Sequence, residues 1–372
     1  MTAPAAPLDE PRPVRAGEEL DAPALEAWLA ASVPGAAPPI EIAQFPGGHS
    51  NLTYLVRAGG RELVLRRPPF GSKVKTAHDM EREYRILSRL FAVYPKAPRA
   101  LAHCTDLRVI GAPFYVAERA TGVVLRGSRL PRGLAVDAAT MRRVSQALVD
   151  GLVELHEVDP VAAGLADLGH PEGYVERQVR GWTERYRAAR TDDIPELERA
   201  AAWLVERLPA GEPGRSGARP AALVHNDYKY DNLVLDPSEL ATIRAVLDWE
   251  MATVGDPLLD LGTSLAYWID PDDAEDHRQL PLGPTLVPGN LGRREVVARY
   301  AARSGRPIAE EDVLFAYVYG LFKVAVIAQQ IYYRFAQGLT KDERFALMIL
   351  AVAVIGRTAA RAIEVGRIDR LG

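Results

Sequence analysis

The sequence predicts an α+β protein built from two lobes, a small β-rich lobe followed by a large and mainly helical one. Alternating apolar runs between residues 40 and 67 are separated by glycine-containing turns, which is typical of antiparallel strands. From about residue 137 onward, apolar residues recur mostly at helical spacing. At 372 residues, the chain is long enough to bury one large core or two medium ones.

Three segments divide the chain. Residues 1–35 are expected to form a proline- and alanine-rich tail and a short helix that Asp21 caps. Residues 36–119 are assigned to the β-rich lobe, and residues 120–372 to the helical lobe. A two-lobed shape leaves a cleft between the lobes, where ligands commonly bind.

The β-rich lobe is expected to contain five strands and one helix. Three antiparallel strands lie within residues 40–67, because Gly59-Gly60 separates two alternating runs and marks a hairpin. Apolar spacing predicts a helix over residues 77–92. Two further strands are expected within residues 108–122.

The second lobe is expected to consist mainly of helices, with two short runs of β character at residues 221–228 and 232–250. The expected helices cover residues 137–157, 172–190, 195–208, 293–304, 309–337 and 341–366.

Composition argues against several classes of protein. The formal net charge is −4, so no global positive field attracts nucleic acid. The single cysteine, Cys104, excludes an internal disulfide framework and favours a reducing, cytoplasmic compartment. The two longest apolar stretches are either interrupted by Lys323, Gln329 and Gln330 or too short to span a bilayer. We therefore expect buried helices and no membrane partner.

The most informative segment is HNDYKYDN, at residues 225–232. Phosphoryl transfer to an alcohol requires metal ligands, a cation for the phosphates and a carboxylate that positions the attacking hydroxyl. Asp227 is the candidate carboxylate, and Lys229 is placed to reach the transferring phosphate. Asn232 and Asp248 are hard oxygen ligands that suit Mg²⁺. Taken one at a time, Asp227, Asn232 and Asp248 would be interpreted as turn residues. Their arrangement together favours catalysis.

The same segment resembles the catalytic loop H-x-D-x-K-x-x-N of protein-kinase-like folds. Asp248 matches the metal-binding aspartate of that fold, and the runs LDWE and GDPLLDLG resemble the aminoglycoside phosphotransferase and choline-kinase-like family. The interval from Asp248 to Asp260 leaves no room for a protein-kinase activation segment. His225 and Asp260 are expected to support the loop structurally.

That resemblance implies a bilobal protein-kinase-like fold and a small-molecule kinase. Such an enzyme would transfer the γ-phosphate of ATP to a substrate hydroxyl in the presence of Mg²⁺, with GTP as the alternative donor.

The run FPGGHSNLTYLV occupies the place of the kinase glycine-rich loop, although it lacks the G-x-G-x-x-G pattern. Backbone N–H groups at such a turn can cradle phosphates, and Gly48, Ser50 and Asn51 are the candidate binding residues. A plain hairpin turn is the competing interpretation of the glycines, and the Ser-Asn that follows them favours phosphate binding.

The resemblance also assigns the remaining nucleotide contacts. Arg66 takes the position of the strand-three lysine, and Glu83 is its ion-pair partner. An arginine fork can hold two phosphate oxygens, but the departure from lysine keeps open a catalytically inactive, nucleotide-binding scaffold. The run FYVAERATG resembles the hinge, where backbone groups from Glu118 to Ala120 would contact a purine.

Further runs spread over residues 40–366, among them YVERQVRGWTERY and FKVAVIAQQIYYRFAQG, resemble the kinase-like domain that is fused to, or encoded beside, acyl-CoA dehydrogenases. This likeness implies a hydroxylated acyl-CoA as the substrate and a functional association with an acyl-CoA dehydrogenase. An aminoglycoside, or another amino-alcohol or sugar, is the alternative acceptor.

Tyr174, Arg177 and Arg334 are the candidate substrate contacts. Positive charges on the helical lobe suit an anionic acceptor better than a polycationic aminoglycoside, although arginines on helices are commonly solvated instead. Lys323 and Arg334 lie on the long apolar helix expected over residues 309–337, where a charge needs a partner. That requirement favours a site role for both.

Overall fold

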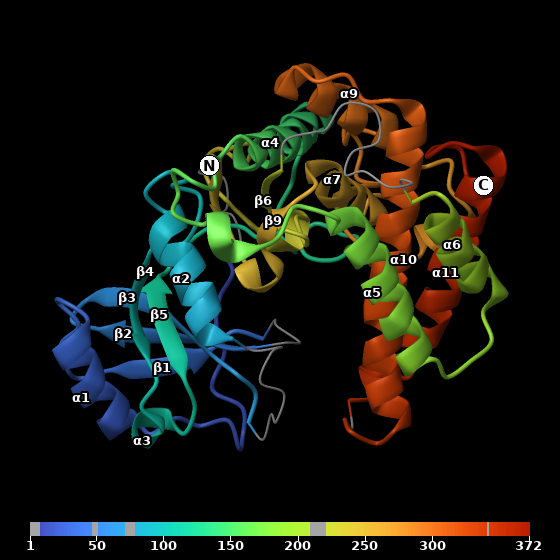
Figure 1. Cartoon of the computed structure of the whole chain (residues 1–372). Helices are drawn as coiled ribbons and strands as arrows, with labels where there is room; N and C mark the ends of the chain where they lie inside the picture. Colours follow the sequence, from blue (N-terminus) through green and yellow to red (C-terminus); the bar gives the residue numbers. More distant parts are fainter. Residues whose placement is uncertain (1–7, 47–50, 71–78, 209–220, 341) are drawn as a thin grey trace.

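The computed structural model describes residues 8–46, 51–70, 79–208, 221–340 and 342–372. It divides into a part built around one sheet and a part built mainly from helices (Figure 1). The predicted bilobal α+β fold is therefore confirmed. Gly48 and Ser50 lie outside the described residues.

The first part is organised around a five-stranded sheet in the order β1-β2-β3-β5-β4. All of its neighbouring strands run antiparallel, and Gly59 and Gly60 turn the β2–β3 hairpin with positive φ angles of 57° and 77°. The three strands expected within residues 40–67 are confirmed. The five strands are Glu41–Gln44 (β1), Leu52–Ala58 (β2), Arg61–Arg67 (β3), Ala100–Cys104 (β4) and Phe114–Glu118 (β5).

One of the two strands expected within residues 108–122 is wrong. Leu107–Ile110 forms a short helix, α3, and the missing strand β4 lies earlier in the chain. Asp106 caps this helix by accepting a hydrogen bond from the backbone N–H of Arg108, and Gly111 ends it at φ 77°. The two caps outweigh the strand propensity of the short apolar run.

Helix α1 (Ala22–Ser32) and helix α2 (Met80–Leu90) pack in different cores. Leu25 and Leu29 of α1 are buried with Phe114 and the apolar side chains of β2 and β3. The buried face of α2 joins instead the core of the helical part. Helix α2 therefore packs between the sheet and the helical part. A charged side chain on α2 can contact residues of either part.

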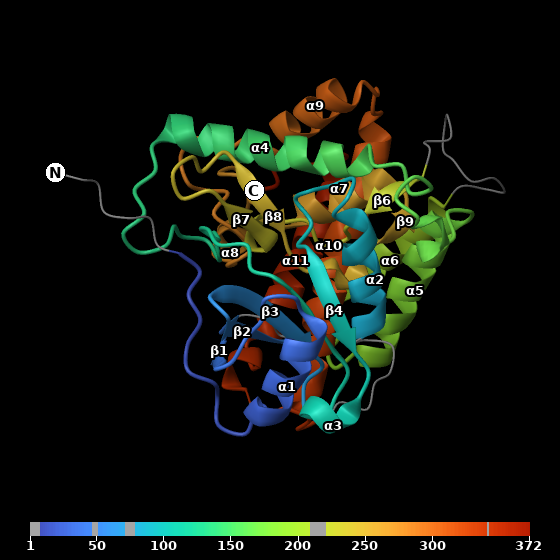
Figure 2. The same ribbon diagram turned by 90° about the vertical axis from the view of Figure 1, so that its left-hand side faces the viewer.

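The helical part surrounds two short antiparallel strand pairs. β6 (Ala222–Val224) pairs with β9 (Thr253–Gly255), and β7 (Leu233–Leu235) pairs with β8 (Ile243–Val246). In Figure 2, α4 runs across the molecule above these strand pairs. Helix α9 lies above α4, and the five-stranded sheet lies below it. The helices are Ala138–His156 (α4), Tyr174–Ala189 (α5), Pro195–Glu206 (α6), Pro257–Ala266 (α7), Glu275–Arg278 (α8), Arg293–Ser304 (α9), Glu310–Ala336 (α10) and Met348–Val365 (α11).

Sequence periodicity missed α7. All ten of its residues are buried, so no polar face gives the helix a 3.6-residue pattern. The sequence does contain the start signal of this helix, an aspartate followed by a proline. In the structure, the Asp256 side chain accepts a hydrogen bond from the backbone N–H of Leu258, and Pro257 occupies the first turn.

Two helical segments of the described residues have the length and apolar composition of membrane spans, Glu310–Ala336 and Glu343–Val365. In the first, 78% of the most apolar window is buried inside the protein, where α10 packs against α5, α7 and α11. In the second the buried share is 44%, and Leu347 and Leu350 are exposed. The expectation of a buried helix thus holds for α10, whereas α11 is buried along one face only.

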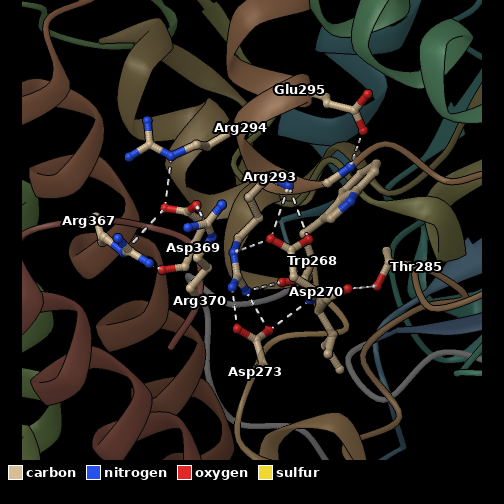
Figure 3. A network of polar contacts seen from close by, with 12 residues as sticks. Trp268, Asp270, Asp273, Thr285, Arg293, Arg294, Glu295, Arg367, Asp369 and Arg370 are labelled. Atoms are coloured by element: carbon tan, nitrogen blue, oxygen red, sulfur yellow. Dashed lines mark hydrogen bonds and ion pairs between the residues drawn. The ribbon is translucent and has the colours of Figure 1, made fainter. Parts of the chain in front are cut away.

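A buried charge network holds the chain that leaves α7 (Figure 3). Arg293, which is completely buried, donates to the backbone oxygen of Trp268 at 2.9 Å and pairs with the carboxylates of Asp270 and Asp273. The neighbouring Arg294 pairs with Asp369 near the C-terminal end of the chain. The network therefore fixes the segment that immediately follows Tyr267.

Helices α7 and α10 approach each other closely at two glycines. A Cβ atom on Gly262 would lie 2.1 Å from the backbone oxygen of Ala316, and one on Gly320 would lie 2.1 Å from the backbone oxygen of Gly262. No side chain fits at these positions without moving a helix.

We expect Gly262→Ala to lower the free energy of unfolding by roughly 1–3 kcal/mol, because the added methyl group forces the two helices apart. Gly181→Ala is the matched control, since its Cβ would meet only the flexible end of Arg185, at 3.6 Å, in the interior of α5. That control should be neutral or stabilising by about 0.5–1 kcal/mol. Denaturant unfolding measures both, and equal stability of the two variants would contradict the close packing.

Candidate active site

The segment HNDYKYDN connects β6 to β7 and is held from below by Asp260 of α7. The Asp260 carboxylate, which is completely buried, accepts hydrogen bonds of 2.7 Å from the backbone N–H groups of His225 and Asn226, and it contacts the His156 ring at 3.1 Å. Burial by itself would raise the pKa of Asp260, but these donors outweigh burial and lower it. Asp260 thus lies where a residue that supports the loop is expected.

His225 is buried within the loop and takes a fixed tautomer. Its Nε2 atom lies 3.0 Å from the backbone oxygen of Leu247 and donates to it, while Nδ1 accepts from the backbone N–H of Asp227 at 3.3 Å. Burial lowers the pKa of His225. A ring that is hydrogen-bonded to two backbone groups fits the structural role predicted for His225.

The Asp227 carboxylate is the centre of the site. It accepts from Lys229 Nζ at 2.8 Å on both oxygens, from the Tyr267 hydroxyl at 2.9 Å and from the Asn232 amide at 2.9 Å. The Lys229 ammonium also lies 4.5 Å from the centre of the Tyr267 ring. Burial would lower the pKa of Lys229, but the Tyr267 and Asp227 oxygens raise it, so Lys229 stays charged.

Sequence reasoning missed Tyr267. It stands at the end of α7, and its hydroxyl and its ring contact the two residues with the expected catalytic roles. No motif pointed to it, because a tyrosine after an apolar helix is usually a core residue.

Asn232 and Asp248 lie at the same end of the β7–β8 pair. Asn232 directly precedes β7, and one residue, Leu247, separates Asp248 from the end of β8. The backbone N–H of Leu247 donates to the backbone oxygen of Asn232 at 2.7 Å. The Asn232 amide nitrogen donates to Asp227, so the side-chain oxygen of Asn232 points away from Asp227. These two oxygen donors fit Mg²⁺, which is commonly held by few protein ligands together with water and phosphate oxygens.

The described residues contain no cluster of three His, Cys, Asp or Glu side chains suited to a metal ion. Asn232 and Asp248 supply two oxygen donors, so a Mg²⁺ ion held there would take its remaining ligands from water or phosphate oxygens.

Arg66 of β3 joins the sheet to this centre. Its guanidinium lies 2.9 Å from Glu83 of α2 and 3.0 Å from Asp248, with Glu250 at 3.9 Å. Burial would lower the pKa of Arg66, but the carboxylates of Glu83, Asp248 and Glu250 hold it well above its usual value. The structure thus brings together Arg66 and Glu83, the pair that was inferred from the resemblance to kinases.

Backbone conformation also marks the site. Among the described residues, the non-glycine residues with positive φ are Asn226 at 66°, Asp248 at 69° and Arg370 at 52°. Of these three, Asn226 directly precedes Asp227, and Asp248 is the candidate metal ligand that contacts Arg66. Such conformations cost energy and concentrate at functional sites, so both loops are held in place by their contacts.

The other expected nucleotide contacts lie on the sheet side of the site. The buried Asn51 donates from its amide to Glu250 at 2.9 Å, which links the start of β2 to the segment after Asp248. The Glu118 carboxylate pairs with Arg61 at 3.1 Å and with Arg99 at 3.4 Å. Ala120 packs against the small apolar cluster around Val234. The side chain of Glu118 is therefore engaged, and the expected hinge contacts would come from the backbone.

The three expected substrate contacts are placed differently from one another. Tyr174 is buried, and its hydroxyl donates to the Asn226 side chain at 3.3 Å, so it braces the catalytic loop. Arg177 is exposed and donates to the backbone oxygens of His170 and Glu172. Arg334 is exposed near the end of α10. No contact among the described residues joins Arg177 or Arg334 to Asp227.

The model of the phosphotransferase enzyme family matches residues 41–292. This range begins with β1 and includes Arg66, Glu83, Asp227, Asn232 and Asp248. The chain belongs to this family. It is accordingly a phosphotransferase that acts on the hydroxyl group of a small molecule, and the resemblance found in the sequence is confirmed.

Members and relatives of the phosphotransferase family match nearly the whole chain. Mouse "Acyl-CoA dehydrogenase family member 10" is 35% identical over 334 residues, which cover 88% of this chain and 30% of that protein. A solved structure from Ralstonia eutropha, provisionally named an aminoglycoside phosphotransferase, is 30% identical with a TM-score of 0.75 and covers 92% of this chain and 98% of its own.

A third match is the aminoglycoside phosphotransferase APH(4)-Ia in complex with ADP and hygromycin B, at 15% identity and a TM-score of 0.54, covering 92% of this chain and 98% of its own. This likeness shows the fold alone. The chain spans less than half the length of the acyl-CoA dehydrogenase relatives that it matches.

Proposed function

We propose that this phosphotransferase uses Mg²⁺ and a nucleoside triphosphate, ATP or alternatively GTP, to phosphorylate the hydroxyl group of a hydroxyacyl-CoA. The observation that carries the proposal is the junction of the two parts of the fold. There the Arg66–Glu83 pair reaches Asp248. The residue before Asp248, Leu247, donates its backbone N–H to the backbone oxygen of Asn232, and the Asn232 amide donates to the Asp227 carboxylate. The ADP complex of the distant relative supports nucleotide use.

Each of these residues has a role that its contacts support. Asp227 orients the acceptor hydroxyl and takes its proton as the new O–P bond forms and the bond from the γ-phosphorus to the β-phosphate oxygen breaks. Lys229 and Arg66 hold phosphate oxygens. Asn232 and Asp248 would hold Mg²⁺, which supplies positive charge beside the phosphates when bound.

Arg66 supports an active enzyme rather than an inactive scaffold. A guanidinium has five N–H donors, so it can keep Glu83 and still turn donors toward a phosphate. Its present contact with Asp248 leaves it at the position where phosphates would meet the metal ligands. The replacement of lysine by arginine therefore retains the charge and adds donors.

The identity of the acceptor rests on the relatives and on surface charge. The curated relatives are named as acyl-CoA dehydrogenase family members and extend well beyond the matched region. Arg177 and Arg180 on α5 and Arg334 on α10 are exposed, and such cations suit the phosphates of coenzyme A. A functional association with an acyl-CoA dehydrogenase and a cytoplasmic location belong to the same proposal.

Phosphorylation assays with one acceptor panel test the proposal. The purified chain is incubated with Mg²⁺ and ATP or GTP, and with hydroxyacyl-CoAs, aminoglycosides or simple amino-alcohols. Products are identified by mass spectrometry, and kcat/KM is compared within the panel. We expect the hydroxyacyl-CoAs to give the highest values. Phosphorylation of aminoglycosides alone would favour the alternative acceptor, and no product with any acceptor would contradict the proposal.

A further inference from the structure

Lys323 is a buried cation directly beneath the catalytic loop. It lies on α10, its exposed fraction is 1%, and no ion pair among the described residues includes it. Its Nζ atom donates to the backbone oxygen of Asn226 at 2.6 Å and lies 3.4 Å from the Asn226 side-chain oxygen. Nζ also lies 5.7 Å from the centre of the Trp182 ring. Burying an ammonium without a directly paired carboxylate still costs stability, so its bond to the loop is the contact that a role for Lys323 must explain.

The backbone oxygen that Lys323 holds belongs to the peptide group between Asn226 and Asp227. The N–H group of the same peptide donates to His225 Nδ1 at 3.3 Å. Both ends of the peptide plane are therefore fixed, and this plane sets the direction in which the Asp227 side chain leaves the backbone.

The contacts of Asn226 show that the loop is held on every side. Its backbone N–H donates to Asp260, and its side chain accepts from the Tyr174 hydroxyl and donates to the backbone oxygen of Met251. With Lys323 on the backbone oxygen, each polar group of Asn226 is engaged. These contacts balance the cost of its positive φ angle of 66°.

We propose that Lys323 is a positioning residue for phosphoryl transfer, whose ammonium holds the Asn226–Asp227 peptide and thereby aims the Asp227 carboxylate. The inference rests on the proposed function, in which Asp227 orients the acceptor hydroxyl. Lys323 does not touch the reacting atoms itself, because its contact is with the backbone oxygen of Asn226.

The charge of Lys323 is sensitive to pH. The groups that face it are Asp260 on α7, Asp227 and Lys229 in the loop and Arg185 on α5, and burial lowers the pKa of Lys323 to about 8 although the two carboxylates oppose this. Between about pH 8 and the ordinary lysine value near 10.5, the unfolded chain binds more protons than the folded one. The Lys323 contribution to stability therefore rises with pH in this window, whereas its hold on the loop weakens.

Lys323→Met tests the proposal, because methionine has a similar length and no charge. We expect kcat to fall roughly 10- to 100-fold, as displaced catalytic groups commonly cause, with the KM values for both substrates nearly unchanged. In the wild type, kcat should fall as the pH rises through about 8, because Lys323 then loses its charge. This fall should be absent in Lys323→Met. Thermal stability should change little, because removal of a buried charge offsets the loss of the hydrogen bond to the Asn226 backbone oxygen. A purely structural role would lower stability instead.

Two further variants complete the experiment. Lys96→Met removes a lysine that pairs with Glu154 and should keep wild-type kcat and pH profile. Lys323→Gln retains N–H donors without the charge, so it should recover part of kcat and still lack the fall near pH 8. Wild-type kcat and an unchanged pH profile in both Lys323 variants would overturn the proposal.

Backbone hydrogen exchange separates this inference from the proposed function. Exchange in residues 223–232 should be faster in Lys323→Met than in the wild type, while exchange elsewhere stays the same. If the wild type phosphorylates no acceptor, the proposed function fails, and the exchange comparison still decides whether Lys323 holds the loop. Unchanged exchange in these residues would overturn the inference regardless of activity.

Discussion

Asp227→Asn is expected to lower kcat by about 10²- to 10⁴-fold, the range found when a proton-accepting group is removed. The amide has nearly the same shape as the carboxylate, but it carries no charge and is a poor proton acceptor. The Lys229 ammonium, 2.8 Å from both carboxylate oxygens, loses its ion pair in this variant. Steady-state kinetics with the acceptor found in the panel measure the effect, and the KM for the nucleotide should change little.

Tyr267→Phe provides the graded comparison for Asp227→Asn. It removes the hydroxyl that donates to Asp227 at 2.9 Å and keeps the aromatic ring beneath Lys229. A hydrogen bond to a charged group contributes about 1.5–3 kcal/mol, so kcat should fall by roughly 10- to 100-fold, less than in Asp227→Asn. Full activity of Asp227→Asn, or a larger loss in Tyr267→Phe than in Asp227→Asn, would contradict the role assigned to Asp227.

Asp260→Ala is expected to lower the free energy of unfolding by about 3–5 kcal/mol, as breaking a buried charged network does. The substitution leaves the backbone N–H groups of His225 and Asn226 without their acceptor and separates His156 from its partner. Denaturant unfolding measures the loss, and kcat should fall with it because the same N–H groups hold the loop. Asp260→Asn keeps one acceptor oxygen and should lie between the wild type and Asp260→Ala.

The pH dependence of this effect has a definite sign. The pKa of Asp260 is lowered in the folded protein, so its contribution is fully present above the unfolded value near 3.9 and is lost as the pH falls through the folded pKa. The difference between the wild type and Asp260→Ala should shrink as the pH falls below about 4.

Asp276→Ala is the matched control, because Asp276 pairs with Arg357 at the surface with 44% of its side chain exposed. Its loss should cost less than about 1 kcal/mol. Equal losses for Asp260→Ala and Asp276→Ala would contradict the view that Asp260 braces the loop.

Prediction from sequence was most successful where local patterns carry the information. The hairpin at Gly59-Gly60 and the long helices follow from turn residues and apolar spacing. It failed at α7, whose uniform burial removes the pattern, and at Leu107–Ile110, where caps at Asp106 and Gly111 outweigh strand propensity. Sequence patterns do not show whether a cap outweighs a strand propensity, and they do not reveal a helix that is buried on every side. These two elements could therefore be assigned only from the structure.

The sequence by itself specifies the reaction class, because the four residues that indicate it lie within one short stretch of chain. They are Asp227, Lys229, Asn232 and Asp248. The fold decides which distant groups serve these residues. Arg66 reaches Asp248 across 182 positions, and Lys323 reaches Asn226 across 97. Such contacts depend on how α10 and the sheet pack around the loop, and hydrogen bonds act only over about 3 Å. No pattern along the chain encodes separations that small between elements so far apart in sequence.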